Sequence, residues 1–177
     1  VQAPLKLFNC NAGFRGRKAQ LYEGGIRVPF ILNQPGKVPV QSLNNIIYFP
    51  DVMPTLAALT GGTKYLPQHL NGMNILPLFY GKQINTDDRV LYWEFPGKQR
   101  AARHGDWKAV TIKGFNAPLE LYNLREDPEE KHDLAKKYPE MVIGFDKVMK
   151  EMRTPSENWP VPQEKNNKIS STKTIKT

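Results

Sequence analysis

The spacing of apolar residues along the chain changes near residue 89, and a short helix is the clearest element before that point. Segment 51–61 has Asp51 at a helix N-cap position and Gly61 where a helix commonly stops. Pro54 is tolerated within the first turn. The pattern predicts a helix whose apolar face is formed by Val52, Leu56 and Leu59.

Two further elements are expected in the same part of the chain. Segment 26–32 is apolar and partly β-branched, and it follows Gly24-Gly25, so it predicts a strand. Pro29 within it favours an edge or a bulge. Segment 75–79 predicts a one-turn helix within a loop.

From residue 89 onward the pattern predicts an antiparallel sheet covered by a helix. His104-Gly105-Asp106 is typical of a tight hairpin turn, and Pro139 marks the start of a helix. Aromatic side chains on the strands are expected to fill the space between sheet and helix (Trp93, Trp107 and Tyr122). The expected strands are 90–95, 100–103, 107–112 and 119–124, and the apolar helix face is Met141, Val142, Phe145, Val148, Met149 and Met152.

Composition and charge exclude several classes of protein. The net charge is +8, but the last fifteen residues carry four lysines against one acid and predict a disordered tail. The remaining basic residues form no stripe interleaved with aromatics, so no nucleic-acid partner is expected. No apolar run reaches the roughly 20 residues that span a bilayer, so no membrane partner is expected. The single cysteine, Cys10, excludes an internal disulfide framework.

The densest concentration of polar chemistry lies in segment 14–29. Arg15, Arg17, Lys18 and Arg27 flank Gly24-Gly25 in a pattern that can present several donors to an oxyanion such as phosphate, sulfate or carboxylate. The glycines allow either a close backbone approach or a positive φ.

The order of residues in this segment resembles a signature of the sulfatase family. Gly16-Arg17-Lys18-Ala19-Gln20-Leu21-Tyr22-Glu23-Gly24-Gly25-Ile26-Arg27-Val28-Pro29 matches the family pattern Gly-x-Lys-x-x-x-Tyr-Glu-Gly-Gly-x-Arg-x-Pro. The resemblance runs from about Gly13 to about Met152 without a large gap. Five more segments follow in the family's order: Gln34-Pro35-Gly36, Pro50-Asp51-Val52-Met53-Pro54-Thr55-Leu56, Asn71-Gly72-Met73-Asn74-Ile75-Leu76-Pro77-Leu78, Arg103-His104-Gly105-Asp106-Trp107-Lys108 and Glu120-Leu121-Tyr122-Asn123-Leu124-Arg125-Glu126-Asp127-Pro128-Glu129-Glu130.

This resemblance implies an α/β fold in two parts. Residues 1–85 are expected to be the end of a large α/β domain of alkaline-phosphatase type. Residues 86–160 are expected to form a small domain with a four-stranded antiparallel sheet and a C-terminal helix. Residues 161–177 are the expected disordered tail.

The resemblance also implies that Lys18 is the catalytic and substrate-binding residue of this chain. In the family this lysine holds a sulfate oxygen, where it offsets charge on the sulfuryl group and on the leaving oxygen. The expected substrate is an aryl or glycan sulfate ester. Tyr22, Glu23 and Arg27 are interpreted as structural, with a local Glu23–Arg27 pair.

The rest of the family's catalytic set is not found in this chain. Sulfatases use a formylglycine nucleophile and a calcium ion, which are expected in the full-length enzyme together with the missing N-terminal part of the polypeptide. The fragment alone is expected to bind no metal and to be inactive. Cys10 fits only part of the nucleophile motif and lies too near Lys18 to be that residue. His69, His104, His132 and the acids of Asp127-Pro128-Glu129-Glu130 are interpreted as solvated surface or turn residues.

Two other functions stay open. One is a non-catalytic binding or structural domain that uses the 89–153 sheet as an interaction surface. The other is an alkaline-phosphatase relative that acts on phosphate esters.

Overall fold

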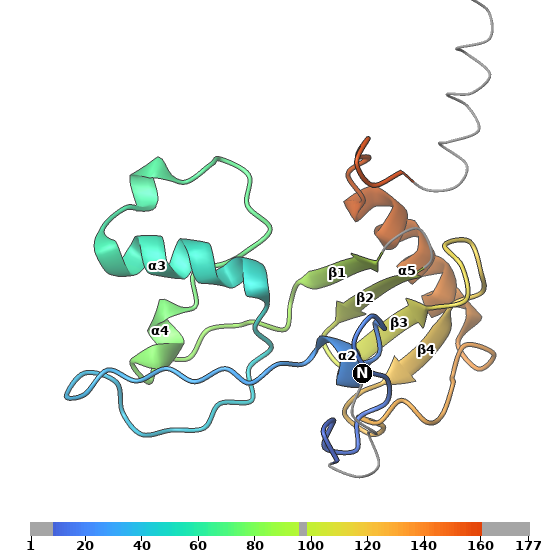
Figure 1. Cartoon of the computed structure of the whole chain (residues 1–177), viewed down its shortest axis with the longest axis horizontal. Helices are drawn as coiled ribbons and strands as arrows, with labels where there is room; N and C mark the ends of the chain where they lie inside the picture. The colour runs from blue at the N-terminus through green and yellow to red at the C-terminus, as the bar shows by residue number, and fades with distance from the viewer. Residues whose placement is uncertain (1–8, 96–98, 161–177) are drawn as a thin grey trace, which may run out of the picture. The chain divides into compact units, whose positions relative to one another are not determined.

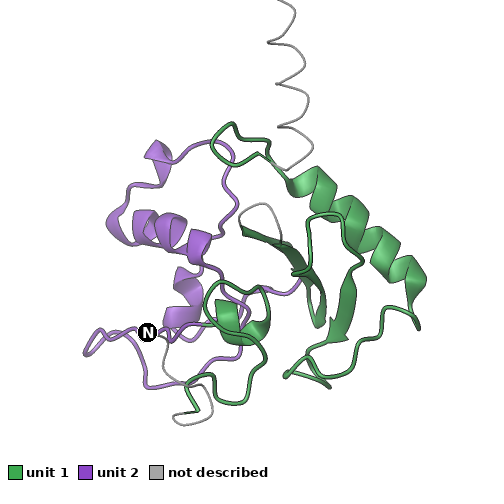
Figure 2. Ribbon diagram, turned by 45° about the vertical axis from the view of Figure 1, so that its right-hand side comes forward, with its two compact units in different colours: residues 1–27, 90–177 green, residues 28–89 purple. Residues whose placement is uncertain are grey.

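The computed structural model describes residues 9–95 and 99–160, which form two compact units (Figure 1; Figure 2). Residues up to Arg27 join those from Val90 onward in unit 1, and Val28–Arg89 form unit 2. It stays a prediction that, in a longer polypeptide, a large domain ends at residue 85 and a small domain begins at residue 86. The expected disordered tail, 161–177, lies outside the described residues.

Unit 1 is built on an antiparallel sheet with the strand order β1-β2-β3-β4. Its strands are β1 (Val90–Phe95), β2 (Gln99–His104), β3 (Trp107–Thr111) and β4 (Glu120–Asn123). His104 pairs with Trp107, which leaves a two-residue turn where Gly105 has a φ of 55°. The predicted strands and hairpin are confirmed, and so is the fold class.

Each face of this sheet is covered by a different segment. On one face Ala102 and Ala109 pack with Phe145 and Met149 of helix α5 (Pro139–Met152). On the other face Ala101 and Val110 pack with residues of the N-terminal segment, including Leu21 and Tyr22. Side chains alternate along a strand, so residues 101 and 102 face opposite layers. The N-terminal segment is therefore part of the core of unit 1.

Three strand aromatics were expected between the sheet and the helix, but only Trp107 lies on the helix face, whereas Trp93 and Tyr122 lie on the opposite face. Tyr122 is buried and Trp93 packs beside it on the face covered by the N-terminal segment. Trp107 lies on the α5 face, edge-on to the ring of Tyr138 at 5.3 Å between centroids. These rings stabilise the packing.

Unit 2 contains the predicted short helix as α3 (Val52–Thr60), ended by Gly61 at a φ of 74°. The other elements are the 3-10 helices η1 (Phe49–Asp51) and η2 (Thr63–Tyr65) and the one-turn helix α4 (Leu76–Phe79). Ile75, Leu78 and Phe79 form the core of this unit. The expected one-turn helix is thus confirmed.

A buried carboxylate holds the start of α3. Asp51 is fully buried, and both of its oxygens lie 2.6 Å from the Arg89 guanidinium. The same oxygens accept the backbone N–H groups of Tyr48 and Met73. Asp51 occupies the N-cap position of α3, but its side chain does not cap that helix. It joins three segments of unit 2.

Two sequence predictions, for segments 26–32 and 51–61, are wrong. No strand occupies 26–32: a one-turn helix, α2 (Glu23–Ile26), ends at Ile26, and no described strand pairs with the residues that follow. The expected apolar face of α3 is not buried either, since Leu56 and Leu59 are 53% and 47% exposed. Thr55 is buried instead, because its hydroxyl donates to Asp51 O and accepts the Ile75 N–H.

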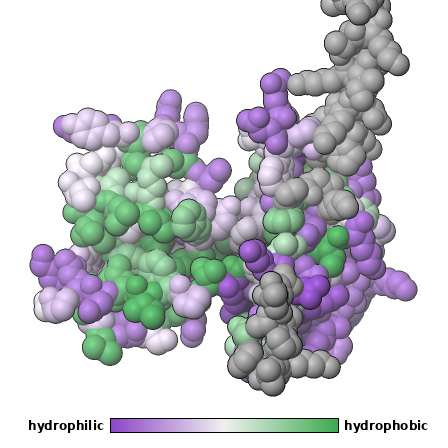
Figure 3. Space-filling view, viewed as in Figure 1, coloured by the Kyte–Doolittle hydropathy of each residue, from purple (hydrophilic) through white to green (hydrophobic). Residues whose placement is uncertain are grey.

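Unit 2 carries many exposed apolar side chains, and Figure 3 shows hydrophobic residues gathered on its visible face. Single exposed apolar residues are ordinary, but a contiguous group marks an interaction surface or an aggregation site. The exposed apolar side chains of unit 2 are those of Val28, Phe30, Ile31, Leu32, Val40, Leu43, Phe49, Met53, Leu56, Leu59, Tyr65, Leu70 and Tyr80. In the described residues, no helix is both long and apolar enough to cross a bilayer.

We expect the purified 177-residue chain to self-associate through this surface. Burying it is worth about 25 cal/mol per Å². Light scattering during a thermal ramp should show aggregation, which Ile31→Ser combined with Phe49→Ser should reduce. A sharp, reversible melt of the unmodified chain as a monomer would contradict this expectation.

Candidate functional site

Lys18 lies in a tight turn on the N-terminal segment of unit 1. The Gln20 N–H donates to Arg17 O at 3.0 Å, and the Gln20 side chain accepts the Arg17 N–H at 3.1 Å. Ala19 has a φ of 70°, in the left-handed region. The Lys18 side chain is exposed, and no described residue pairs with it.

Gly24 and Gly25 are needed because the backbone of this segment folds closely on itself. A Cβ on Gly24 would lie 2.7 Å from the carbonyl oxygens of Phe14 and Arg15. A Cβ on Gly25 would lie 2.0 Å from Gln20 O. Neither glycine has a positive φ, so close approach is the reason for both.

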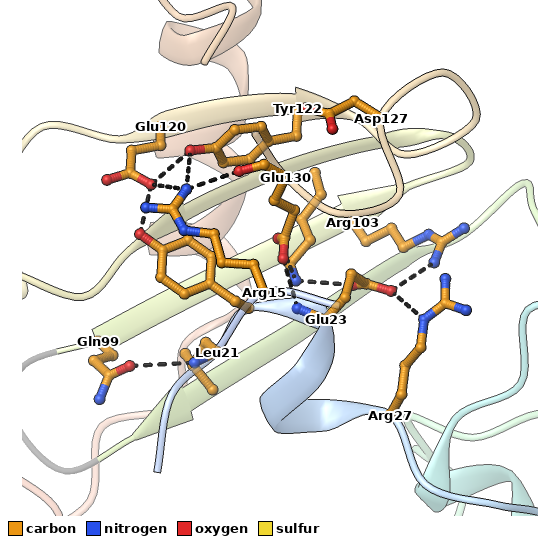
Figure 4. Close-up of polar contacts among 12 residues, drawn as sticks. Arg15, Leu21, Glu23, Arg27, Gln99, Arg103, Glu120, Tyr122, Asp127 and Glu130 are labelled. Carbon is orange, nitrogen blue, oxygen red and sulfur yellow. Dashed lines mark hydrogen bonds and ion pairs between the residues drawn. The ribbon is translucent and has the colours of Figure 1, made fainter. Parts of the chain in front are cut away.

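A buried ion network fixes α2 on the sheet (Figure 4). Lys108 Nζ, from β3, lies 2.8 Å from Glu23 Oε1 and 2.9 Å from Glu130 Oε1. The Glu23 N–H donates to Glu130 Oε2 at 2.7 Å. All three side chains are almost fully buried, so each depends on the others to offset the cost of leaving water.

The two carboxylates of this network ionise differently. Burial would raise the pKa of Glu23, but Lys108 and Arg27 outweigh that effect and hold it below its usual value. Burial raises the pKa of Glu130, and the opposing effects of Lys108 and the Glu23 N–H do not cancel it. The difference arises because Glu23 has more cations beside it than Glu130 has. Arg27 Nε lies 2.6 Å and Arg103 Nη1 lies 3.8 Å from Glu23 Oε2.

A second network surrounds Arg15. Its guanidinium stacks on the Tyr22 ring at 3.9 Å and donates to Tyr122 Oη at 2.7 Å and to Glu130 O at 2.9 Å. Both tyrosine hydroxyls donate to Glu120 Oε2, at 2.6 and 2.7 Å. Burial, together with that hydrogen bond, raises the pKa of each tyrosine far above its usual value, so both stay protonated.

These contacts divide the four cations of the basic segment into two pairs. Arg15 belongs to the tyrosine network, and Arg27 binds Glu23 and lies over the Phe14 ring at 4.2 Å. Arg17 and Lys18 are exposed at the turn. The local Glu23–Arg27 pair and the structural role of Tyr22 agree with the sequence prediction. The cations of this segment that remain available to bind an oxyanion are therefore Arg17 and Lys18.

The side chain of Gln99 connects the turn to the sheet. Gln99 is the first residue of β2, and its Nε2 donates to Ala19 O at 2.8 Å. Its Oε1 accepts the Leu21 N–H at 3.2 Å. One amide therefore holds the backbone on both sides of Gln20.

Sequence reasoning missed Lys108, Glu120, Glu130 and Gln99. Glu130 is fully buried, so its interpretation as a solvated acid is wrong. Asp127 is not free in solvent either: it accepts the backbone N–H groups of Lys131 and His132. A signal was available for Lys108, because a lysine on the inward side of a strand requires a buried counter-charge.

The remaining candidates from the sequence are surface residues. His69, His104 and His132 are exposed, as is Cys10. Within residues 9–95 and 99–160, no group of three or more His, Cys, Asp or Glu side chains is placed to hold a metal ion. The described residues thus do not fit a calcium ion, which the family resemblance implies for the full-length enzyme.

Comparison with known sequences places the chain among sulfatases. Residues 14–156 match the family described as N-sulphoglucosamine sulphohydrolase, C-terminal. A sulfatase of Formosa agariphila is 31% identical over 145 residues, covering 73% of this chain and 26% of that protein. Arylsulfatase K of Canis lupus familiaris is 28% identical over 145 residues, covering 75% of this chain and 27% of that protein. N-acetylgalactosamine-6-O-sulfatase of Bacteroides thetaiotaomicron is 28% identical over 156 residues, covering 80% of this chain and 30% of that protein.

Solved structures agree with the sequence comparison. The structure of Ps i-CgsB has a TM-score of 0.69 at 26% identity and matches 92% of this chain and 37% of its own. A structure from work on the metabolism of multiple glycosaminoglycans by Bacteroides thetaiotaomicron has a TM-score of 0.67 at 26% identity. The match covers 79% of this chain and 32% of that one.

The sheet, its covering helix and the Lys18 segment thus define the C-terminal region of a sulfatase. The chain belongs to the N-sulphoglucosamine sulphohydrolase C-terminal family. It spans between a quarter and a third of the length of the curated relatives described above.

Proposed function

We propose that this chain is the C-terminal part of a sulfuric ester hydrolase and that Lys18 binds the sulfate group of the substrate. The observation that carries the proposal is that two of the four cations in segment 14–29 are bound within the fold, while Arg17 and Lys18 are exposed on a constrained turn. Of these two, Lys18 is the one that matches the lysine of the family signature. A lysine kept unpaired in such a turn has its charge available for a ligand.

Hydrolysis of a sulfate ester converts R–O–SO₃⁻ and water into R–OH and hydrogen sulfate. The bond between sulfur and the ester oxygen breaks, and negative charge grows on that oxygen. The Lys18 ammonium group can donate up to three hydrogen bonds, to a sulfuryl oxygen or to the leaving oxygen. Its positive charge stabilises the transition state there.

Carbohydrate sulfates are the substrate class that the relatives favour. One relative acts on N-acetylgalactosamine 6-O-sulfate by its name, and one structural neighbour comes from glycosaminoglycan metabolism. Aryl sulfates remain within the proposal because arylsulfatase K is also a relative. Formylglycine and calcium are expected in the longer polypeptide, and the 177-residue chain alone is expected to be inactive.

The test is release of inorganic sulfate by the longest polypeptide that the gene encodes and by the 177-residue chain. Each is assayed with calcium on an aryl sulfate, on a sulfated hexosamine and on the matching phosphate esters. We expect sulfate release by the longer form only. Release of phosphate but not of sulfate would favour a phosphoesterase, and no hydrolysis by a folded polypeptide carrying formylglycine would favour a binding domain.

A further inference from the structure

We propose that Gln99 is a positioning residue for Lys18, acting through the backbone of the turn. This inference rests on the proposed function, because it assumes that Lys18 contacts the sulfate group. Gln99 is only 9% exposed and lies on the sheet, whereas Lys18 is exposed on the turn. The amide itself therefore need not touch the substrate.

The first support is the pattern of hydrogen bonds. Gln99 donates to Ala19 O and accepts from the Leu21 N–H, so it binds the residue after Lys18 and the residue that begins the buried part of the segment. Among the described residues, the other hydrogen bonds of the turn run between Arg17 and Gln20 and are internal to it. They shape the turn without fixing it to the sheet.

The second support is the strained backbone beside Lys18. Ala19 adopts a φ of 70°, and the left-handed region costs a residue with a Cβ about 1–2 kcal/mol. Such a conformation persists only where the surroundings enforce it. The hydrogen bond from Gln99 to Ala19 O acts on this residue directly.

The third support is that the rest of the segment is anchored without Gln99. Tyr22 binds Glu120, and Glu23 binds Lys108 and Glu130, all within the buried networks of unit 1. Removing the Gln99 amide should therefore loosen the turn while α2 stays in place. Loss of the Gln99 amide should therefore lower kcat/KM more than it lowers the stability of the fold.

The experiment is a double-mutant cycle in the longest polypeptide, using hydrolysis of a sulfate ester. Gln99→Met keeps the size of the side chain but removes both hydrogen bonds. We expect it to lower kcat/KM about 10-fold with a small change in Tm, since displacing a catalytic group by about 1 Å can cost up to about 100-fold. In a Lys18→Ala background the same substitution should change kcat/KM less than about twofold, because groups that act through each other are not additive.

Gln41→Met is the matched control. Gln41 also uses its amide to bind backbone, donating to Leu78 O at 2.9 Å and Phe79 O at 3.3 Å in unit 2. Whatever its effect on activity, that effect should be the same with and without Lys18.

Two results would overturn the inference and leave the role of Lys18 intact. One is an unchanged kcat/KM in Gln99→Met. The other is an equal loss from Gln99→Met in the parent and in the Lys18→Ala background, which would mean that Gln99 acts on the fold in general. If Lys18→Ala itself has no effect, the proposed role of Lys18 fails, and the inference falls with it.

Discussion

Replacing Lys18 by alanine in the longest polypeptide is expected to lower kcat/KM for a sulfate ester about 100-fold. Loss of one preorganised donor at a developing oxyanion typically costs about 100- to 1,000-fold. The Lys18 side chain is exposed and unpaired among the described residues, so folding should be unaffected. Steady-state kinetics of sulfate release, with Tm measured alongside, checks this result.

Two variants sharpen that experiment. Lys18→Arg keeps the charge but replaces a compact ammonium by a planar fork, so it should recover activity only in part. Lys147→Ala removes an exposed lysine from α5 and should leave kcat/KM unchanged. The role of Lys18 would be refuted if Lys18→Ala and Lys147→Ala gave the same rate.

Replacing Lys108 by methionine is expected to destabilise unit 1 by about 3–5 kcal/mol at neutral pH. Breaking a buried ion pair from one side leaves an uncompensated charge, and here Lys108 serves two buried carboxylates. Hydrogen exchange of the β3 and β4 amides in the longest polypeptide would report the loss locally. Lys147→Met, at a side chain that is 76% exposed, should change stability by less than about 0.5 kcal/mol.

The Lys108→Met effect should also depend on pH. In the parent chain the pKa of Glu23 is lowered, so its stabilisation is present above its ordinary pKa of 4.5 and is lost as the pH falls through the lower folded value. Without Lys108 the pKa of Glu130, which is already raised in the parent, should rise further, while Glu23 keeps Arg27 and Arg103 beside it. The variant should therefore lose stability as the pH rises and Glu130 ionises. The difference between the two proteins should therefore be smaller near pH 4 than near pH 8. A difference that is independent of pH would contradict the ion-network account.

The elements of unit 1 could be predicted because their sequence signals are local. Strand alternation, the Gly105 turn and the apolar stripe of α5 each depend on residues close together in the chain. The strand expected at 26–32 failed for the opposite reason, since a strand requires a partner and the apolar composition of that segment does not supply one.

The buried polar networks could not be predicted because they join residues far apart in sequence. Glu23 and Lys108 are 85 positions apart, and Glu23 and Glu130 are 107 apart. The sequence pattern supports a local Glu23–Arg27 pair, which has a separation of only four. The burial of Thr55 in α3 was missed for a related reason, because its hydroxyl binds the backbone of Ile75, which is 20 residues away.

The signature segment therefore has two parts with different roles. Tyr22, Glu23 and Arg27 bind the segment to the sheet, and the turn at Lys18 remains exposed. Because a catalytic group must be held within about 0.5 Å of its productive position, the anchoring residues matter as much as the lysine.

The most direct test of the central claim is a crystal structure of the longest polypeptide with a sulfate ester or inorganic sulfate bound. The account predicts that Lys18 Nζ lies about 2.7–3.2 Å from a sulfate oxygen, with the Gln99 contacts to Ala19 and Leu21 retained. A sulfate group bound at the catalytic centre with Lys18 directed into solvent would contradict it.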